Sequence, residues 1–407
     1  MREALGALTS RGRGFLAGGV TAILCGIAFG ERDLVRIGVV VALLPLLAAA
    51  WLARSGNRLG LARMLSSRLV EAGQVATIQL DLTNVGPMTG VLLVEDQIPY
   101  ALGSRPRFVI DTMAPGWRRT VRYQVRSEVR GQYVVGPMHV RVDDPFGLIE
   151  LHRTFTRTTD LVVTPKVEPL PAIALRGTWA GTGDNRPRAF SSGSAADVTV
   201  REYHLGDDLR RVHWRSTAHM GELMVRREEQ PWQSRCTLLV DNRAKAHRGT
   251  GPSSSVEVAV NAAASVGVHL TRLGYQVRLV SASGEELGHG WHDGDHVVDA
   301  GPMLRRLAVL PTATSNALST EWVDETITTG LFVAVLGATD ERDRAFFSRI
   351  HSGAGAPYAL VLDVSQWSNR VEPTQPPATG WLQSHGWKAT SLGRLTPLAR
   401  AWQELGR

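Results

Sequence analysis

The sequence contains few cysteines and almost no lysine. Cysteine occurs only at Cys25 and Cys236 in 407 residues, too few for a disulfide framework, so we expect a reducing compartment, the cytosol, for most of the chain. Lysine occurs only at Lys166, Lys245 and Lys388, so arginine supplies most of the basic charge. The formal net charge is +7, but the arginines are scattered and no zinc-finger, homeodomain or aromatic RNA-binding signature accompanies them. We therefore expect no nucleic-acid partner.

Familiar catalytic and nucleotide-binding motifs are also missing. The sequence lacks Gly-x-Ser-x-Gly, His-Glu-x-x-His and the phosphate-binding Gly-x-x-x-x-Gly-Lys. The run Gly12-x-Gly14-x-x-Ala17 is no dinucleotide motif, because no strand precedes it and an apolar run follows. We expect neither a cofactor nor an enzymatic activity; the alternative is a metal-dependent hydrolase in cell-envelope metabolism.

Long uncharged runs are present near the N-terminus. Residues 14–30 and 37–53 each reach the length of about 17 residues that a helix needs to cross the hydrocarbon core of a membrane. Glu31, Arg32, Asp33 and Arg36 lie between them, which predicts a polar turn within a membrane hairpin over residues 1–58. A cleaved signal peptide and a buried helical pair are the rival interpretations; no small-residue cleavage site supports the first and no polar face the second.

The arginines that flank this hairpin predict its orientation. Positively charged loops stay on the cytoplasmic side, and only Arg32 and Arg36 lie in the predicted turn. Arginines outside the hairpin are more numerous: Arg2, Arg11 and Arg13 before it, and Arg54, Arg58, Arg63 and Arg68 after it. We expect an inner-membrane protein that crosses twice, with both termini cytoplasmic and a kink at Pro45.

Residues 61–167 predict a β-sandwich. Short alternating segments separated by turn residues are typical of such domains. The predicted strands are Thr77 to Thr83, Val91 to Gln97, Arg107 to Thr112, Thr120 to Ser127, Gln132 to Val135, His139 to Val142 and Leu161 to Thr164. An immunoglobulin-like arrangement is expected, although strand lengths leave the strand order open.

Residues 168–197 are rich in Pro, Gly and Ser, and predict either an ordered strap or a flexible linker before an α/β domain at 198–407. In that domain strands and helices alternate, which predicts a largely parallel sheet covered by helices on both faces. The predicted strands are 236–240, 277–280, 332–336 and 359–362, and the predicted helices are 256–273, 302–310, 342–350 and 395–405.

Two stretches carry a resemblance to a known family. The first runs from Arg130-Gly131-Gln132-Tyr133 through Asp143-Asp144-Pro145-Phe146-Gly147-Leu148, and the second is Arg201-Glu202-Tyr203-His204-Leu205-Gly206-Asp207-Asp208-Leu209-Arg210-Arg211-Val212-His213-Trp214, followed by Glu222-Leu223-Met224-Val225-Arg226 and Leu238-Leu239-Val240-Asp241. Together they resemble the bacterial family called domain of unknown function 58. The resemblance implies a membrane hairpin, a β-rich domain and a Rossmann-type α/β domain similar to von Willebrand factor A. It also implies work beside a MoxR-type AAA+ ATPase and transglutaminase-like membrane proteins.

In von Willebrand factor A domains, a metal site begins with Asp-x-Ser-x-Ser at the end of the first strand. The corresponding residues are Asp241, Asn242, Arg243 and Lys245, so cationic side chains replace the hydroxyls that suit Mg²⁺. The later strand ends at Leu336 to Ala338 without an acid, although Asp340 follows. We expect that metal binding at this position is lost.

Two further clusters call for a choice between chemistry and structure. The histidines and aspartates of residues 289–296 resemble metal ligands in composition, but their glycine-rich spacing favours an exposed polar turn. Asp207 and Asp208 with His204 and His213 contain acids and bases for hydrolysis, yet Gly206 to Asp208 is better explained as a helix cap.

The segment 201–214 is nevertheless our candidate interaction surface. Its candidate residues are Tyr203, Gly206, Asp207, Asp208, Arg210, His213 and Trp214. Tyr203 and Trp214 have large apolar faces with polar groups, which suits them to pack between domains or to anchor a partner. The sequence thus predicts a membrane-anchored adaptor; a purely structural component of a membrane complex is the third possibility.

Overall fold

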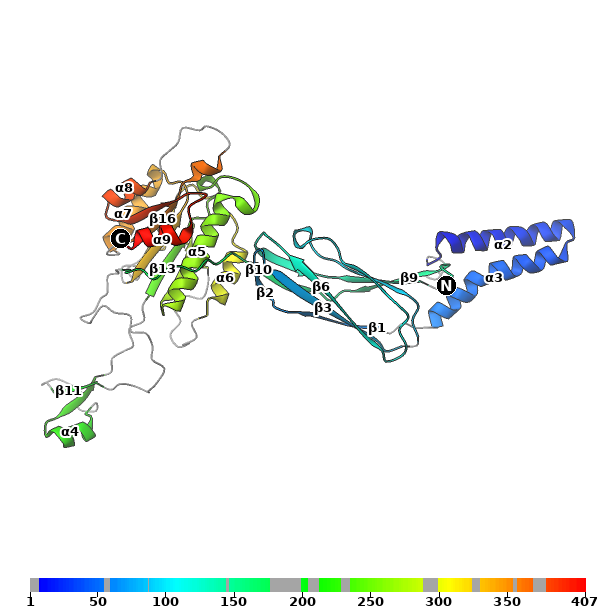
Figure 1. The fold of residues 1–407 in the computed structure, drawn as a ribbon, viewed down its shortest axis with the longest axis horizontal. Coiled ribbons are helices and arrows are strands. Elements are labelled where there is room, and N and C mark those ends of the chain that lie inside the picture. Colours follow the sequence, from blue (N-terminus) through cyan, green and yellow to red (C-terminus); the bar gives the residue numbers. More distant parts are fainter. Residues whose placement is uncertain are drawn as a thin grey trace. The chain divides into compact units, whose positions relative to one another are not determined.

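The computed structural model describes residues 7–54, 59–86, 88–143, 146–175, 199–203, 212–227, 235–287, 299–323, 330–353, 357–368 and 378–407. It divides into two compact units, Met1–Lys166 and Val167–Arg407 (Figure 1).

Two antiparallel helices begin the first unit: α2 (Ser10–Phe29) and α3 (Arg32–Arg54). Thr9 caps α2 by accepting a hydrogen bond from the Gly12 amide at 3.1 Å, which extends the helix beyond its predicted start at residue 14. Helix α3 begins at Arg32 rather than at residue 37, so most of the predicted turn is helical. An ion pair of 2.9 Å between Arg36 and Asp33 stabilises that first turn, since residues three apart share a helix face.

Small residues bring α2 and α3 into close contact. Gly12, Gly19 and Gly26 are the buried residues of α2, and their spacing of seven places them along one stripe. A Cβ atom at Gly19 would lie 2.6 Å from the backbone nitrogen of Ala42, so only glycine allows this approach. Pro45 lies inside α3.

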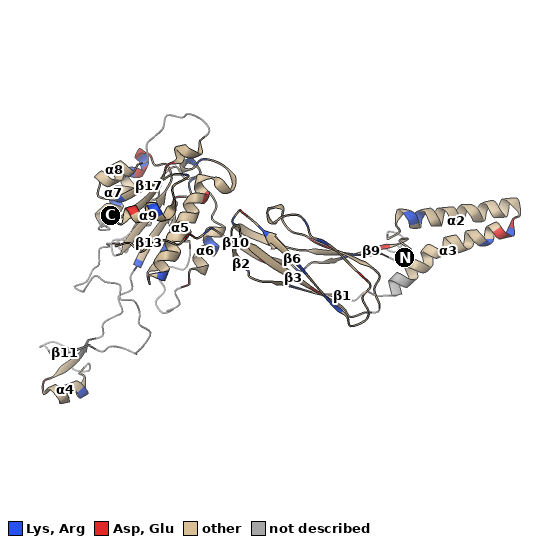
Figure 2. Cartoon of the chain, viewed as in Figure 1, with Lys and Arg blue, Asp and Glu red and all other residues tan. Residues whose placement is uncertain are grey.

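The outer surfaces of both helices are apolar. Their most apolar windows have mean hydropathies of 1.5 and 2.1, and only 17% and 11% of those residues are buried. Charged residues gather near the start of α2 and at the turn (Figure 2). By length and composition, the two helices are sufficient to cross a membrane.

The rest of the first unit is made of β-strands arranged in three sheets, with orders β1-β3-β6, β2-β10-β7 and β5-β4-β8-β9. All pairs are antiparallel except β10 with β2. The elements are β1 (Leu59–Leu65), β2 (Leu69–Glu71), β3 (Val75–Asn84), β4 (Leu92–Asp96), η1 (Tyr100–Leu102), β5 (Arg107–Ile110), β6 (Arg118–Arg126), β7 (Gly131–Val135), β8 (Met138–Asp143), β9 (Glu150–Phe155) and β10 (Thr159–Thr164).

Alternate residues of these strands face one core. In β3 the buried residues recur at every second position, from Ala76 to Leu82, as a half-buried strand requires. Residues of all three sheets join that core, together with Ala48 of α3. Each predicted strand overlaps an observed one, whereas β1, β2 and β9 were not predicted. The reason is visible in β9, whose exposed polar residues give no apolar alternation.

An extended strap opens the second unit. Leu170 is buried in the α/β core, the Glu168 amide donates to Ser265 at 3.0 Å, and Trp402 donates to the Pro171 carbonyl at 3.1 Å. The sequence left an ordered strap and a flexible linker as alternatives for this segment, and residues 167–175 form an ordered strap. Residues 176–198 lie outside the described residues.

The α/β part of this unit contains a five-stranded parallel sheet with the order β14-β13-β15-β16-β17. Its strands are buried on both faces: Leu238 and Val333 face one core with α5 and α9, while Leu239 and Phe332 face the other with α7 and α8. The elements are β13 (Arg235–Val240), η3 (Ala244–Ala246), η4 (Gly251–Ser253), α5 (Ser255–Arg272), β14 (Gln276–Ser281), α6 (Gly301–Ala308), β15 (Leu331–Leu336), η6 (Glu341–Asp343), α7 (Arg344–Gly353), β16 (Tyr358–Leu362), η7 (Val364–Trp367), α8 (Thr379–Ser384), β17 (Lys388–Leu392) and α9 (Leu398–Leu405). The predicted alternation is observed, and β17 and α8 add a strand and a helix that were not predicted.

A small structure precedes this sheet in the chain. Strand β11 (Thr199–Glu202) pairs antiparallel with β12 (Met224–Arg227), and the short helix α4 (Trp214–Met220) lies between them in sequence. Val212 adds a bridge to Val225, and Val212, Met224 and Val225 are buried.

Candidate functional site

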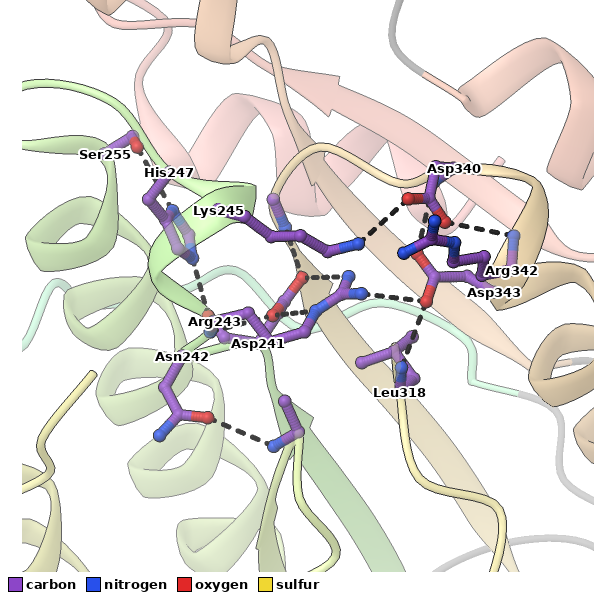
Figure 3. Close-up of polar contacts among 12 residues, drawn as sticks. Asp241, Asn242, Arg243, Lys245, His247, Ser255, Leu318, Asp340, Arg342 and Asp343 are labelled. Carbon is purple, nitrogen blue, oxygen red and sulfur yellow. Dashed lines mark hydrogen bonds and ion pairs between the residues drawn. The ribbon is translucent and has the colours of Figure 1, made fainter. Parts of the chain in front are cut away.

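The carboxyl ends of β13 and β15, neighbouring central strands, hold a group of buried charges. Asp241 follows β13 directly and Asp343 lies in η6, which follows β15. Arg243 lies between the two carboxylates (Figure 3). In open α/β sheets this edge is where ligands commonly bind.

Arg243 joins both acids by charge-assisted hydrogen bonds. Its Nε and Nη2 atoms donate to Oδ1 and Oδ2 of Asp241 at 2.9 and 2.8 Å, a bidentate pair. Its Nη1 atom donates to Oδ1 of Asp343 at 2.8 Å. All three side chains are fully buried. A planar guanidinium is suited to this arrangement because its donors diverge in fixed directions.

Backbone amides complete the coordination of both carboxylates. Asp241 also accepts from the amides of Arg243, at 3.1 Å, and Gly337, at 3.3 Å. Asp343 accepts from the amides of Leu318, at 3.0 Å, and Asp340, at 3.1 Å. The loops after β13 and β15 and the segment at 318 therefore meet at one cluster of charges.

The electrostatics keep the guanidinium charged. Burial by itself lowers the pKa of Arg243, but hydrogen bonds to Asp241 and the negative charges of Asp241 and Asp343 raise it further, and the net shift is upward. The Arg243 side chain therefore acts as a permanent internal cation between two acids.

Gly337 allows the two loops to approach each other. A Cβ atom at this position would collide with the backbone carbonyl of Ala246, and the neighbouring Ala338 amide donates to that same carbonyl at 2.8 Å. The glycine that ends the predicted strand is thus a packing requirement of the site.

His247 supports the cluster from the side of η3. Its Nε2 contacts the Asp241 carbonyl at 2.6 Å and its Nδ1 contacts the Ser255 hydroxyl at 3.1 Å. Because a carbonyl can only accept, Nε2 carries the proton and Nδ1 accepts from Ser255. Burial, as the largest effect, lowers the pKa of His247 and keeps the ring neutral.

Asn242 connects the end of β13 to the loop after β14, the strand on its other side. Its side-chain amide donates to the Pro311 carbonyl at 2.8 Å, and its side-chain oxygen accepts from the Ala282 amide at 3.2 Å. This residue, one of the predicted site positions, therefore orders the loops and has its polar atoms satisfied.

Lys245 forms a second, more exposed ion pair at the rim. Its Nζ lies 2.9 Å from Oδ2 of Asp340, and the side chains are 32% and 42% exposed. The hydrogen bond from Lys245 lowers the pKa of Asp340. The structure thus brings Asp241, Asn242, Arg243 and Lys245 together, with Arg243 buried inside the cluster and Lys245 at its partly exposed edge.

This arrangement is chemically a closed ion cluster. The guanidinium lies between the two carboxylates and is paired with both. Within the described ranges, no group of three or more His, Cys, Asp or Glu residues is arranged to hold a metal ion. The loop 289–296 lies outside the described residues.

The second predicted site is described only in part. Tyr203 is half-buried and its amide donates to the Leu223 carbonyl at 2.8 Å. Gly206, Asp207, Asp208 and Arg210 lie outside the described residues, as does the helix cap predicted there.

His213 caps the helix α4 of this segment. Its Nδ1 accepts from the Ser216 amide at 3.3 Å. Trp214 begins the helix with 71% of its surface exposed.

Sequence reasoning missed Asp343 and His247. Asp343 lies 100 residues from its partner Arg243, a separation no local pattern reveals. The available signal was a capping box at the start of η6. In it the Asp340 side chain accepts from the Arg342 amide, and the Asp343 side chain accepts from the Asp340 amide. Nothing in the sequence around His247 distinguishes it from a surface histidine.

The comparison with protein families matches part of this unit. Residues 199–321 match the model described as "Protein of unknown function DUF58". Through this segment the chain is similar to the DUF58 family. The match begins at β11 and includes Asp241, Arg243, Lys245 and His247, whereas Gly337, Asp340 and Asp343 lie beyond its end.

Other similarities are more distant. The "Uncharacterized protein YeaD" of Bacillus subtilis (strain 168) is 25% identical over 234 residues, which are 56% of this chain and 56% of that relative, so the aligned part spans about half the length of either. The solved CARDB domain of a Pyrococcus furiosus protein, in complex with di-metal ions, is 16% identical and covers 26% of this chain and 93% of its own, at a TM-score of 0.21. The alkylpurine DNA glycosylase AlkC of Pseudomonas fluorescens, bound to DNA containing an abasic site analog, is 16% identical and covers 33% and 39%, at a TM-score of 0.20. TM-scores this low carry no argument about the fold.

Proposed function

We propose that this DUF58 protein is a membrane-anchored adaptor whose cytoplasmic units bind a protein partner, a MoxR-type AAA+ ATPase. The observation that carries the proposal is an exposed apolar surface within the family segment. Trp214, Met220 and Leu223 expose 71%, 65% and 42% of their surfaces on the structure made of β11, α4 and β12. Exposed aromatic and methionine side chains are the residue types that anchor protein interfaces.

The anchor is the hairpin of α2 and α3, which we infer crosses the inner membrane twice. Its apolar, outward-facing residues and the charged residues at its ends support this role. The excess of arginines outside the turn favours cytoplasmic termini. A fusion of a reporter that fluoresces only in the cytosol after Arg407 should be bright; a dark fusion together with an active periplasmic reporter would reverse the orientation.

We infer finer folds for both units. A shared core among its sheets supports an immunoglobulin-like sandwich for the β-rich unit. In the α/β sheet, Glu286 forms an antiparallel bridge with Val280 of the edge strand β14. Counting this bridge as a rudimentary strand gives the Rossmann-type order 3-2-1-4-5-6, which supports a von Willebrand factor A-like domain.

The buried cluster favours binding over hydrolysis at the sheet edge. A hydrolytic metal needs an open coordination position and side-chain ligands that are free to bind it. Here the carboxylates of Asp241 and Asp343 are already occupied by Arg243. The cluster instead fixes the loops after β13 and β15, and a fixed surface binds a partner without first losing the entropy of ordering.

A crosslinked pull-down from detergent-solubilised membranes tests the adaptor role. Trp214→Ala should reduce recovery of the ATPase at least severalfold while leaving thermal stability unchanged, because the indole is already exposed. Leu395→Ala, at an apolar side chain that is 92% exposed outside the family segment, is the matched control and should capture normally. Equal recovery from wild type and both variants would contradict the proposed surface.

A further inference from the structure

One end of the β-rich unit gathers the base of the hairpin and several loops. The strand registers place Leu59, Asn84, Arg118 and Ile110 at this end, since Leu59 pairs with Asn84, Arg118 with Thr83, and Ile110 with Leu92. The loops that follow Asn84 and precede Arg118 are joined there: the Thr89 amide donates to the Met113 carbonyl at 3.0 Å, and the Gly116 amide donates to the Asn84 carbonyl at 2.8 Å. We call this the hairpin end of the unit.

The hairpin is fixed to this end by its own backbone. The Thr9 amide donates to the Leu148 carbonyl at 3.0 Å, and the backbone of Gly12 lies against the same carbonyl, where a Cβ atom has no room. The uncharged run begins at Gly14. With a rise of about 1.5 Å per residue, Gly14 is only about 3 Å further along the helix than Gly12. The loop at Leu148 therefore lies within one helical turn of the first membrane-facing residues.

Large apolar side chains are exposed on the loops of the hairpin end. Val85 is 68% exposed, Met88 56% and Trp117 64%. Their neighbours Asn84, Thr89 and Met113 are buried and hydrogen-bonded, so the loops are ordered while these side chains point outward.

Basic side chains accompany them. Arg11 and Arg13 at the base of α2, and Arg118 and Arg119 at the start of β6, are exposed, with Asp111 as an exposed acid nearby. Tryptophan and arginine together suit the boundary between hydrocarbon and headgroups, because the ring is apolar with a polar edge and the guanidinium pairs with phosphate.

We propose that the hairpin end docks on the cytoplasmic surface of the membrane, with Val85, Met88 and Trp117 inserted among the headgroups of anionic phospholipid. The inference rests on the proposed membrane anchor. It means that the β-rich unit contacts the membrane surface directly, in addition to its connection to the hairpin. Continuity with the hairpin and the positive charge of the arginines select a lipid surface over a second copy of the chain.

The test measures how deep three positions lie in a bilayer, with the full chain reconstituted in vesicles of phosphatidylcholine and phosphatidylglycerol. An environment-sensitive fluorophore is attached to native Cys25 in α2, or, in a Cys25→Ala background, to Met88→Cys or to Tyr100→Cys. Tyr100 is the matched control: it is 96% exposed and lies in η1, which follows the opposite end of β4. Cys236 is fully buried and stays in place. Val85→Cys is the second test position if Met88→Cys folds poorly.

Nitroxide lipids then report depth. The Cys25 probe should be quenched by nitroxides deep in the acyl chains, and the Met88 probe by nitroxides near the headgroups, about twofold more strongly than the Tyr100 probe. Arg118→Glu with Arg119→Glu should weaken the Met88 signal, and pure phosphatidylcholine vesicles should weaken it too. Quenching at Cys25 with equal values at Met88 and Tyr100 would overturn this inference alone. A Met88 probe shielded from water but not quenched by lipid would indicate a second copy and also overturn it. Absence of quenching at Cys25 would remove the anchor itself.

Discussion

Arg243 and Asp343 form a buried ion pair between Nη1 and Oδ1 at 2.8 Å, although 100 residues separate them in the sequence. The same guanidinium holds Asp241 in a bidentate pair, so one side chain connects the loops after two neighbouring strands. Removing one partner of a buried pair leaves an uncompensated charge, whereas exposed pairs contribute little. Because Arg243 is fully buried and Lys245 is partly exposed, we expect the ion pairs of Arg243 to contribute more to stability than the ion pair of Lys245.

Arg243→Ala should lower the free energy of unfolding of the α/β unit by about 3 to 5 kcal/mol, because Asp241 and Asp343 would face each other without a cation. Lys245→Ala should cost less than about 1 kcal/mol, because its pair with Asp340 is partly exposed. Both losses can be measured by chemical denaturation of the full chain in detergent, with hydrogen exchange of the β13 amides as the readout. Equal losses in the two variants would show that the cluster does not carry the stability assigned to it.

Divalent cations should distinguish wild type from Arg243→Ser. In the wild-type protein the guanidinium occupies the position between the carboxylates, so Mg²⁺ should leave the Tm unchanged. In Arg243→Ser a hydroxyl replaces the cation next to Asp241, and millimolar Mg²⁺ or Mn²⁺ should raise the Tm by preferential binding to the folded state. Arg243→Ser with Asp241→Ala is the control and should not respond. A saturable stabilisation of the wild type would contradict the closed cluster.

His247 should make stability depend on pH. Burial, as the largest cause, holds the pKa of His247 in the folded state below the ordinary histidine value of about 6.5. The unfolded chain therefore binds a proton first as the pH falls through about 6.5, and the free energy of unfolding decreases there. The contribution is fully present at higher pH. Since burial also lowers the pKa of His269, the wild-type slope contains both residues.

His247→Gln should flatten the part of this slope that His247 contributes, and His152→Gln is the control because His152 is largely exposed. Hydrogen exchange of the β13 amides at pH 7.5, 6.5 and 5.5, corrected for intrinsic exchange, supplies the measurement. A slope that His247→Gln leaves unchanged would mean that His247 is not the titrating group.

Packing of the hairpin should depend on Gly19 and not on Gly18. A side chain at Gly19 would collide with the backbone of Ala42, whereas a Cβ at Gly18 meets nothing within 4 Å. Gly19→Ile should therefore force α2 and α3 apart, and Gly18→Ile should leave them in contact. Helicity and electrophoretic mobility during titration with sodium dodecyl sulfate report the separation. Identical titrations of the two variants would argue against this interface.

Much of the element inventory followed from local patterns. The alternation of apolar residues identified strands such as β3 because one face of each is buried. The buried strands β13, β15 and β16 were recognisable as short apolar runs between helical segments. Strand β9 escaped because it is an edge strand with exposed polar side chains, which gives no periodic signal. The ends of α2 and α3 differed because Thr9 and the Arg36–Asp33 pair extend helices through polar sequence.

By itself, the sequence determined that the chain has an apolar hairpin, a β-rich unit and an α/β unit. Strands buried on one face show alternating apolar residues, and strands buried on both faces show continuous apolar runs. The resemblance to von Willebrand factor A domains predicted Arg243 and Lys245 at positions where a cation site needs hydroxyls. Only the tertiary structure decided that Arg243 is enclosed by Asp241 and Asp343 while Lys245 stays at the rim, since that depends on the distant segment after β15 folding back on β13. It likewise decided that Trp214 is exposed, because a large apolar ring suits a core and an interface equally until its surroundings are known.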